Sequence, residues 1–219
     1  MVRNESDLVH YGSIVTDQSR LLMSHVDHIL QFASMRSGKD RYTLRPIQVP
    51  EILERVKKNT SALIAEESYV LEERIRPGLP DVLGDMFAIC GCLENLITNA
   101  VKYSKDDRRI IISAALDEVE HDGKEVTISV EDHGIGIQRS DLKNIFEPFY
   151  RSAEAIAAQI HGTGLGLSLA KHLAEAMGGR LSVKSEMGLG SVFTLHLQLA
   201  QPEDRGSRGI DAEVIQVGK

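Results

Sequence analysis

Three glycine-rich segments constrain the fold of this chain more than any other feature. Residues 132–137 read Asp-His-Gly-Ile-Gly-Ile after a Val- and Ile-rich stretch, and residues 162–167 read Gly-Thr-Gly-Leu-Gly-Leu at the start of a helix-forming stretch. The third segment, residues 188–191, reads Gly-Leu-Gly-Ser between two strand-forming stretches. Glycine lets a backbone approach its neighbours closely, and free N–H groups at a helix start bind anions. The first two segments therefore predict a ligand site, whereas the third is equally typical of a hairpin turn.

The stretches around these glycines alternate between helix and strand patterns. Apolar spacing and capping residues predict helices over residues 49–65, 86–103 and 165–177, and Asp85 is the expected cap of the second. Period-two alternation and β-branched residues predict strands over residues 42–45, 69–75, 82–83, 109–116, 125–132, 180–185 and 191–199. The last four strands form hairpins. We therefore predict a two-layer α/β sandwich with a mixed, mostly antiparallel sheet and helices on one face. The glycine pattern of a Rossmann fold is missing.

A long helix is predicted before this domain. Residues spaced alternately by four and three form a heptad seam, namely Leu8, Gly12, Val15, Ser19, Leu22, Val26, Ile29 and Ala33. Such a seam favours pairing with another helix, and the alternative is a helix that lies on its own domain. From residue 201 onward the polar composition predicts a disordered tail. The expected division is residues 1–38 for the helix, 39–200 for the α/β domain and 201–219 for the tail.

Charge and composition exclude some classes of function. The 219 residues carry a net charge of -7, so a nucleic acid would be repelled. A phosphate ligand would be repelled too, unless the site supplies local donors and a metal ion. No apolar stretch reaches the ~20 residues of a membrane span, and no signal peptide follows Met1. We expect a cytoplasmic location, with any membrane anchor upstream of these residues. Cys90 and Cys92 are expected to be small buried hydrophobes.

The helix predicted over residues 86–103 carries an unusual polar face. Asn95, Asn99 and Lys102 lie at positions i, i+4 and i+7, so they share one side of the helix. Asparagine is a poor helix former, and two of them in mid-helix indicate a function. Their amide oxygens are suitable ligands for Mg²⁺, and the lysine would neutralise phosphate. Asp132 could accept a hydrogen bond from the exocyclic amine of adenine.

Together these motifs resemble the catalytic and ATP-binding domain of sensor histidine kinases. The helix with two asparagines, the strand ending in Asp-x-Gly-x-Gly, a Phe-Glu-Pro-Phe box at residues 146–149 and residues 162–167 follow that family's order and spacing. The resemblance covers about residues 42–199 and implies the Bergerat nucleotide-binding fold, shared with Hsp90 chaperones, type II topoisomerases and MutL proteins. It also implies ATP and Mg²⁺ as ligands, a homodimer through the N-terminal helix and a response regulator receiver domain as partner.

The resemblance further implies roles for particular residues. Asp132 would bind adenine, Asn99 with the help of Asn95 would hold Mg²⁺, and Glu94 would be the general base that activates the attacking histidine. Lys102 and Tyr103 would contact the phosphates. The other implied pocket residues are Gly134, Gly136, Ile137, Gly162, Thr163, Gly164, Leu165, Gly166 and Leu167.

A lid is implied between the Phe box and the second glycine segment. Residues 150–161 have an Ala-rich centre with high helix propensity and little to anchor it. We expect nucleotide to order this segment. Arg151 at its beginning would steady the γ-phosphate, and His133 and His161 are interpreted as spacers within the glycine motifs.

The family's phosphate-accepting histidine has no counterpart in this sequence. That histidine precedes an acidic residue and a proline, whereas His10 is followed by Tyr11 and Gly12. The heptad seam resembles the second helix of the family's dimerisation hairpin, so the acceptor helix either lies upstream or is missing from the natural protein. We therefore expect a kinase module that phosphorylates a histidine outside these residues. The alternative is a nucleotide-binding pseudokinase without phosphotransfer. A chaperone-like or mismatch-repair ATPase would need large additional domains.

Overall fold

The computed structural model describes residues 41–104, 107–119, 123–201 and 214–216, together with nine helical positions between residues 11 and 30. The helices are α2 (Val49–Glu66), α3 (Met86–Tyr103), α4 (Ala153–Ala157) and α5 (Gly166–Ala176). The strands up to the first hairpin are β1 (Arg41–Thr43), β2 (Arg45–Ile47), β3 (Val70–Ile75), β4 (Val82–Gly84), β5 (Arg109–Val119) and β6 (Gly123–Asp132). The remaining strands are β7 (Arg180–Glu186), β8 (Gly190–Gln198) and β9 (Val214–Gln216). Within this described part, no helix is long and apolar enough to cross a membrane.

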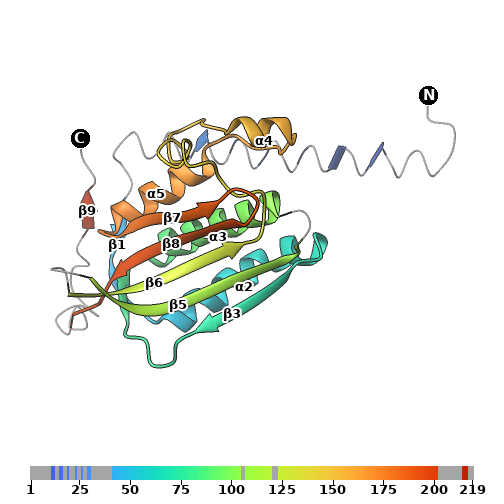
Figure 1. Ribbon diagram of the computed structural model, residues 1–219. Helices are drawn as coiled ribbons and strands as arrows, with labels where there is room; N and C mark the ends of the chain where they lie inside the picture. Colours follow the sequence, from blue (N-terminus) through green and yellow to red (C-terminus); the bar gives the residue numbers. More distant parts are fainter. Residues whose placement is uncertain are drawn as a thin grey trace.

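The centre of the molecule is a five-stranded sheet in the order β3-β5-β6-β8-β7. β3 runs parallel to β5, and every other neighbouring pair is antiparallel. Helices α2, α3 and α5 lie side by side behind one face of the sheet, and α3 is in the middle (Figure 1). This arrangement confirms the predicted two-layer sandwich with a mixed, mostly antiparallel sheet.

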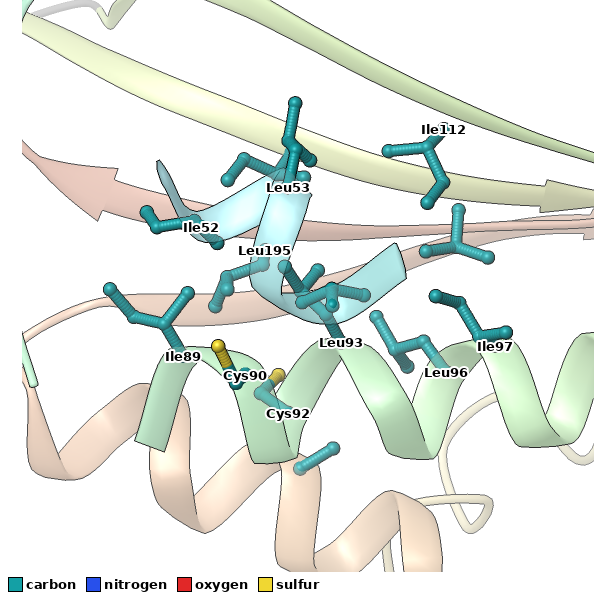
Figure 2. Packing of buried hydrophobic residues seen from close by; sticks show 14 of the residues in the cluster. Ile52, Leu53, Ile89, Cys90, Cys92, Leu93, Leu96, Ile97, Ile112 and Leu195 are labelled. Carbon is teal, nitrogen blue, oxygen red and sulfur yellow. The ribbon is translucent and has the colours of Figure 1, made fainter. Parts of the chain in front are cut away.

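The core forms where α3 faces the sheet. Asp85 begins α3 as its N-cap, with Oδ1 accepting hydrogen bonds from the backbone N–H groups of Phe87 and Ala88 at 2.9 and 3.1 Å. The buried side of α3 then meets residues of α2 and the sheet, as Figure 2 shows for Leu93, Leu96, Ile112 and Leu195 among others. Cys90 and Cys92 are buried free thiols, as predicted. Packing this side into the core leaves the Asn95, Asn99 and Lys102 side only half-buried.

The two predicted hairpins are present, and the first is longer than expected. β5 continues to Val119 and β6 begins at Gly123, because Asp117 and Glu118 keep their pairing with Glu125 and Lys124. In the second hairpin, Gly188 and Gly190 have φ angles of +79° and +106°, which side chains other than glycine rarely adopt. Helix α5 ends before Gly178, whose φ is +72°.

Both ends of the α/β region differ from the prediction. The strand predicted over residues 42–45 is two strands separated by Leu44, since β1 pairs with β9 and β2 pairs with β4. Residues 214–216 form β9, where the sequence predicted a disordered tail. Val214 and Ile215 are β-branched, which favours a strand once β1 offers a partner. The other tail residues after Gln201 lie outside the described residues.

Much of the predicted heptad seam is described as helix. Gly12, Val15, Ser19, Val26 and Ile29 are helical and exposed. Leu8, Leu22 and Ala33 lie outside the described residues. Apolar side chains on an exposed seam are consistent with the predicted helix pairing, which stays a prediction.

Candidate functional site

Two adjoining cavities lie at the C-terminal end of α3. Both are bounded by Asn99 and Tyr103 of α3 and by Ile145, Tyr150 and Leu167. Their volumes are about 60 and 70 Å³, whereas pockets for ligands of drug size usually measure about 300–1,000 Å³. The shared wall makes the two cavities halves of one site. Their small volumes mean that a large ligand must displace one of the walls.

Asp132 forms the polar end of the first half. This residue ends β6, is only 5% exposed, and its Oδ1 accepts a hydrogen bond from the Gly134 N–H at 2.8 Å. Burial raises the pKa of Asp132 to about 6, against the lowering effects of backbone N–H groups of Gly134 and Ser191 and of nearby His133. The fully buried Ser104 hydroxyl also lowers the pKa of Asp132, although it makes no hydrogen bond of normal geometry within the part of the chain that the structure describes. A ligand amine that donates to Asp132 would stabilise the ionised carboxylate.

The glycine loop after Asp132 lies directly against the backbone of α3 and of β7. A Cβ at Gly134 would overlap the carbonyl oxygen of Tyr103, and a Cβ at Gly136 would overlap that of Glu186. Gly136 also has a φ of +69°. The N–H of Ile135 donates to the Tyr103 carbonyl at 3.2 Å. Close backbone packing therefore requires both glycines and fixes the floor of this half.

The third glycine segment braces the same loop. A Cβ at Gly190 would overlap the Asp132 carbonyl oxygen, and the N–H of Gly188 donates to the Ile135 carbonyl at 2.8 Å. Ser185 Oγ accepts from the N–H of Ile137 at 2.8 Å. The sequence left residues 188–191 as either a hairpin turn or a pocket element. Both interpretations apply, because the hairpin turn itself supports the Asp132 wall.

The second half of the site brings the polar face of α3 to the start of α5. The Nδ2 of Asn95 donates to the Gly91 carbonyl at 2.8 Å, which leaves its Oδ1 free to face α5. A Cβ at Gly166 would lie 3.1 Å from this Oδ1, so glycine keeps the gap open. Lys102 lies in the same wall, and burial lowers its pKa. The free N–H groups of α5 and the Lys102 ammonium make this end suitable for phosphate.

The residues of this half also fit a magnesium ion. The amide of Asn99 borders both cavities, and Oδ1 of Asn95 has no hydrogen-bond partner in the part of the chain that the structure describes. Among the described residues, no three His, Cys, Asp or Glu side chains gather to hold a metal. Mg²⁺ keeps several waters and is usually bound by few protein groups together with substrate phosphates. An ion here would depend on these amides and on the phosphates of the ligand.

The predicted lid covers both halves. It contains the short helix α4, whose N-cap Ser152 accepts from the N–H of Ala155 at 3.2 Å. Ala155 is 3% exposed and lines the first cavity, and Ile160 is 6% exposed. Arg151 lines the first cavity and donates through Nη2 to the Ile160 carbonyl, so it joins the two ends of the lid. The lid therefore has more anchors than the sequence suggested.

Most predicted pocket residues are brought together, and three are not in a cavity wall. Gly134 and Leu165 lie just behind the wall, as packing residues. Glu94 faces α2 instead, where its Oε1 accepts a hydrogen bond from Nδ2 of Asn59 at 2.7 Å. Successive helix residues differ by about 100° in direction, so Asn95 faces the site while Glu94 does not. The role of Glu94 as general base stays a prediction, and the structure places its side chain on the α2 side of α3.

The family of histidine kinase-, DNA gyrase B-, and HSP90-like ATPases matches residues 84–201, which include α3, the Asp132 loop, the lid and α5. The chain belongs to this family. The matched residues include the residues that line the two cavities.

The relatives are sensor kinases. The chain is 30% identical over 203 residues to the sensor histidine kinase RcsC of Escherichia coli, and 34% identical over 186 residues to two-component system protein A of Emericella nidulans. These matches cover 91% and 84% of this chain but only 21% and 27% of the relatives. Full-length ShkA in complex with AMPPNP has a TM-score of 0.72 at 26% identity, over 91% of this chain and 41% of that one.

Several wall residues were not predicted from the sequence. The cavities are also lined by Thr98, Ile145, Tyr150, Ser152, Ala155, His161, Ser191 and Phe193. Thr98 could have been found, because it lies three residues after Asn95 on the polar face of α3. Phe193 could not, since the alternation of β8 shows that it is buried without showing which end of the core it reaches.

Proposed function

We propose that this chain is the ATP-binding catalytic module of a two-component sensor histidine kinase, which transfers the γ-phosphate to a histidine outside these residues. The observation that carries the proposal is the single site formed by two unlike halves. One half offers a buried carboxylate, and the other offers a lysine, amides and a helix start. The amine of adenine suits the carboxylate, and the negative charge of a triphosphate suits the lysine, the amides and the helix start.

Each half has a separate task in this proposal. Asp132 accepts the exocyclic amine of adenine over the floor made by Gly134 and Gly136. Asn95 and Asn99 hold Mg²⁺, which when bound neutralises charge on the phosphates. Lys102 and Tyr103 contact the phosphates, and the N–H groups of residues 163–167 cradle them.

The base that deprotonates the attacking histidine is proposed with a condition. Glu94 lies one residue from Asn95 but on the α2 side of α3. It can serve as base only if the acceptor helix approaches over that side and brings its histidine between Glu94 and the γ-phosphate. Otherwise the acceptor helix supplies its own base. Glu94→Gln separates these two routes.

The partners are proposed from the relatives and the exposed seam. We propose that the N-terminal helix pairs with its counterpart in a homodimer, and that a response regulator receiver domain receives the phosphate. RcsC is named a sensor histidine kinase, and two-component system protein A is named for two-component signalling. The module acts in the cytoplasm, where ATP is available, and any membrane anchor belongs to other segments of the parent protein.

The decisive experiment mixes the chain with radiolabelled Mg-ATP and a separate two-helix acceptor fragment. Acid-labile, base-stable phosphate on the acceptor supports phosphotransfer, and Asp132→Asn and Asn99→Ala should abolish it. Loss in Glu94→Gln assigns the base to this chain, and retention assigns it to the acceptor. Tight Mg-ATP binding without transfer to any acceptor would replace the proposal with the nucleotide-binding pseudokinase.

A further inference from the structure

We propose that His161 is a ligand of the terminal phosphate, and so selects nucleoside triphosphates over diphosphates. This inference rests on the proposed function. The sequence gives His161 no role beyond that of a spacer before Gly162. In the structure it lines the second cavity with Asn95, Asn99 and Lys102, although it belongs to the lid and they belong to α3.

The charge of this cavity favours a phosphate at His161. The titratable side chains in its wall are Lys102, Tyr103, Tyr150 and His161. No aspartate or glutamate contributes to that wall, whereas the adjoining cavity contains Asp132. The chain as a whole has a net charge of -7, so a cavity wall without carboxylates differs from the overall charge of the protein. It leaves imidazole N–H and ammonium groups as the donors for the most negative part of the ligand.

The backbone around His161 is held in place while its side chain is not. Ile160 is buried, its N–H donates to the Ala155 carbonyl at 3.0 Å, and its carbonyl accepts from Arg151. His161 itself is exposed, and its ring makes no hydrogen bond or ion pair within the part of the chain that the structure describes. Gly162, which follows, has open space around it. An anchored start and an unpaired ring let His161 meet a phosphate without breaking an existing contact.

The position in the lid implies selectivity. The adenine end is fixed by Asp132, so the terminal phosphate lies farthest from it, at the cavity that His161 borders. On this proposal a diphosphate lacks the group that His161 contacts, whereas it keeps its contacts with Lys102 and the start of α5. Loss of the imidazole should therefore affect the two nucleotides unequally.

The test compares equilibrium binding of Mg-AMPPNP and Mg-ADP by calorimetry. His161→Ala should weaken Mg-AMPPNP by about tenfold and Mg-ADP by less than about twofold, as expected for one charge-assisted hydrogen bond to the third phosphate. His161→Arg, which replaces the imidazole with another N–H donor, should restore most of the triphosphate affinity. His172→Ala on α5 is the matched control, because His172 is outside both cavity walls and should change neither affinity.

Equal weakening of both nucleotides, or no weakening of Mg-AMPPNP, would overturn the inference while leaving the proposed function intact. Wild-type protein that binds neither nucleotide would overturn both. Thermal unfolding of His161→Ala in the absence of nucleotide should match wild type, since the ring is exposed and unpaired.

Discussion

The two glycine segments of the site differ in why they need glycine. In the Asp132 loop, side chains at positions 134 and 136 would overlap the backbone of Tyr103 and Glu186. In the segment after the lid, a Cβ at Gly162 would meet nothing within 4 Å, whereas Gly164, with a φ of +73°, lies against backbone and a Cβ at Gly166 would lie 3.1 Å from the Asn95 side chain. The Asp132 side is thus a fixed wall built into the fold, whereas the lid side is a cover with open space at Gly162. The two segments have similar sequence motifs although their packing differs.

The largest effect expected is that of a single methyl group at position 136. Gly136→Ala forces a strained φ and a backbone overlap, so the free energy of unfolding should fall by at least about 3 kcal/mol. Gly162→Ala is the matched control and should change it by no more than about 0.5 kcal/mol. Urea denaturation measures both. Similar losses in the two variants would remove the distinction between wall and cover.

The next largest effect separates binding from stability at the wall. Asp132→Asn should weaken Mg-AMPPNP binding by about 100-fold, because a charge-assisted hydrogen bond to the adenine amine is lost. Calorimetry measures the affinity. Asp117→Asn, on a strand away from the site and bonded to Thr127 at 3.1 Å, should leave it unchanged. If Asp132→Asn bound the nucleotide normally, the adenine contact would have to be sought elsewhere.

The same carboxyl gives a pH dependence with a definite sign. Burial raises the pKa of Asp132 from 3.8 to about 6, so the group is protonated below about pH 6 and stops accepting from the amine. Affinity for Mg-AMPPNP should fall about tenfold from pH 7 to pH 5. Asp132→Asn provides the control, because any pH dependence of affinity that remains in this variant comes from titration of the nucleotide phosphates. An identical slope in wild type and variant would contradict the assignment.

In the absence of nucleotide, the ionisation of Asp132 affects the stability of the fold in the opposite direction. A raised pKa means that the folded protein disfavours the ionised carboxylate, so this group lowers stability as the pH rises from about 4 to about 6. The loss is on the order of 3 kcal/mol at most. Nucleotide should offset it above pH 6, which thermal unfolding at several pH values would detect.

The smallest effect concerns the cover. Mg-AMPPNP should slow proteolysis within residues 150–161 by at least about threefold, because cleavage requires the lid to open. Trypsin, which can cut after Arg151, provides the measurement, and a cleavage site after Arg74 on β3 is the internal control. Equal cutting with and without nucleotide would mean that the lid does not respond to the ligand.

The sequence predicted the elements well and the directions of side chains less well. The Asp85 cap, α3 and the hairpins follow from local patterns that the fold preserves. The motif did not show which side of α3 Glu94 occupies, because adjacency in sequence does not specify the side of a helix, and its carboxylate accepts a hydrogen bond from Asn59 of α2. The role of Gly190 and the position of His161 depend on contacts between segments distant in the chain, which no local pattern encodes. The strand at 214–216 likewise exists only because β1 offers it an edge.

The bracing of Asp132 by β7 and β8 also sets the order in which the site can be made. The carboxylate is in place once β6 exists, but its wall is completed by Gly188 and Gly190, more than fifty residues later. During synthesis the amino-terminal part emerges first, so a nascent chain that ends before β8 has an adenine-binding residue without an adenine site. If Asp132 binds adenine as proposed, nucleotide would stabilise only chains in which β8 has docked against β6.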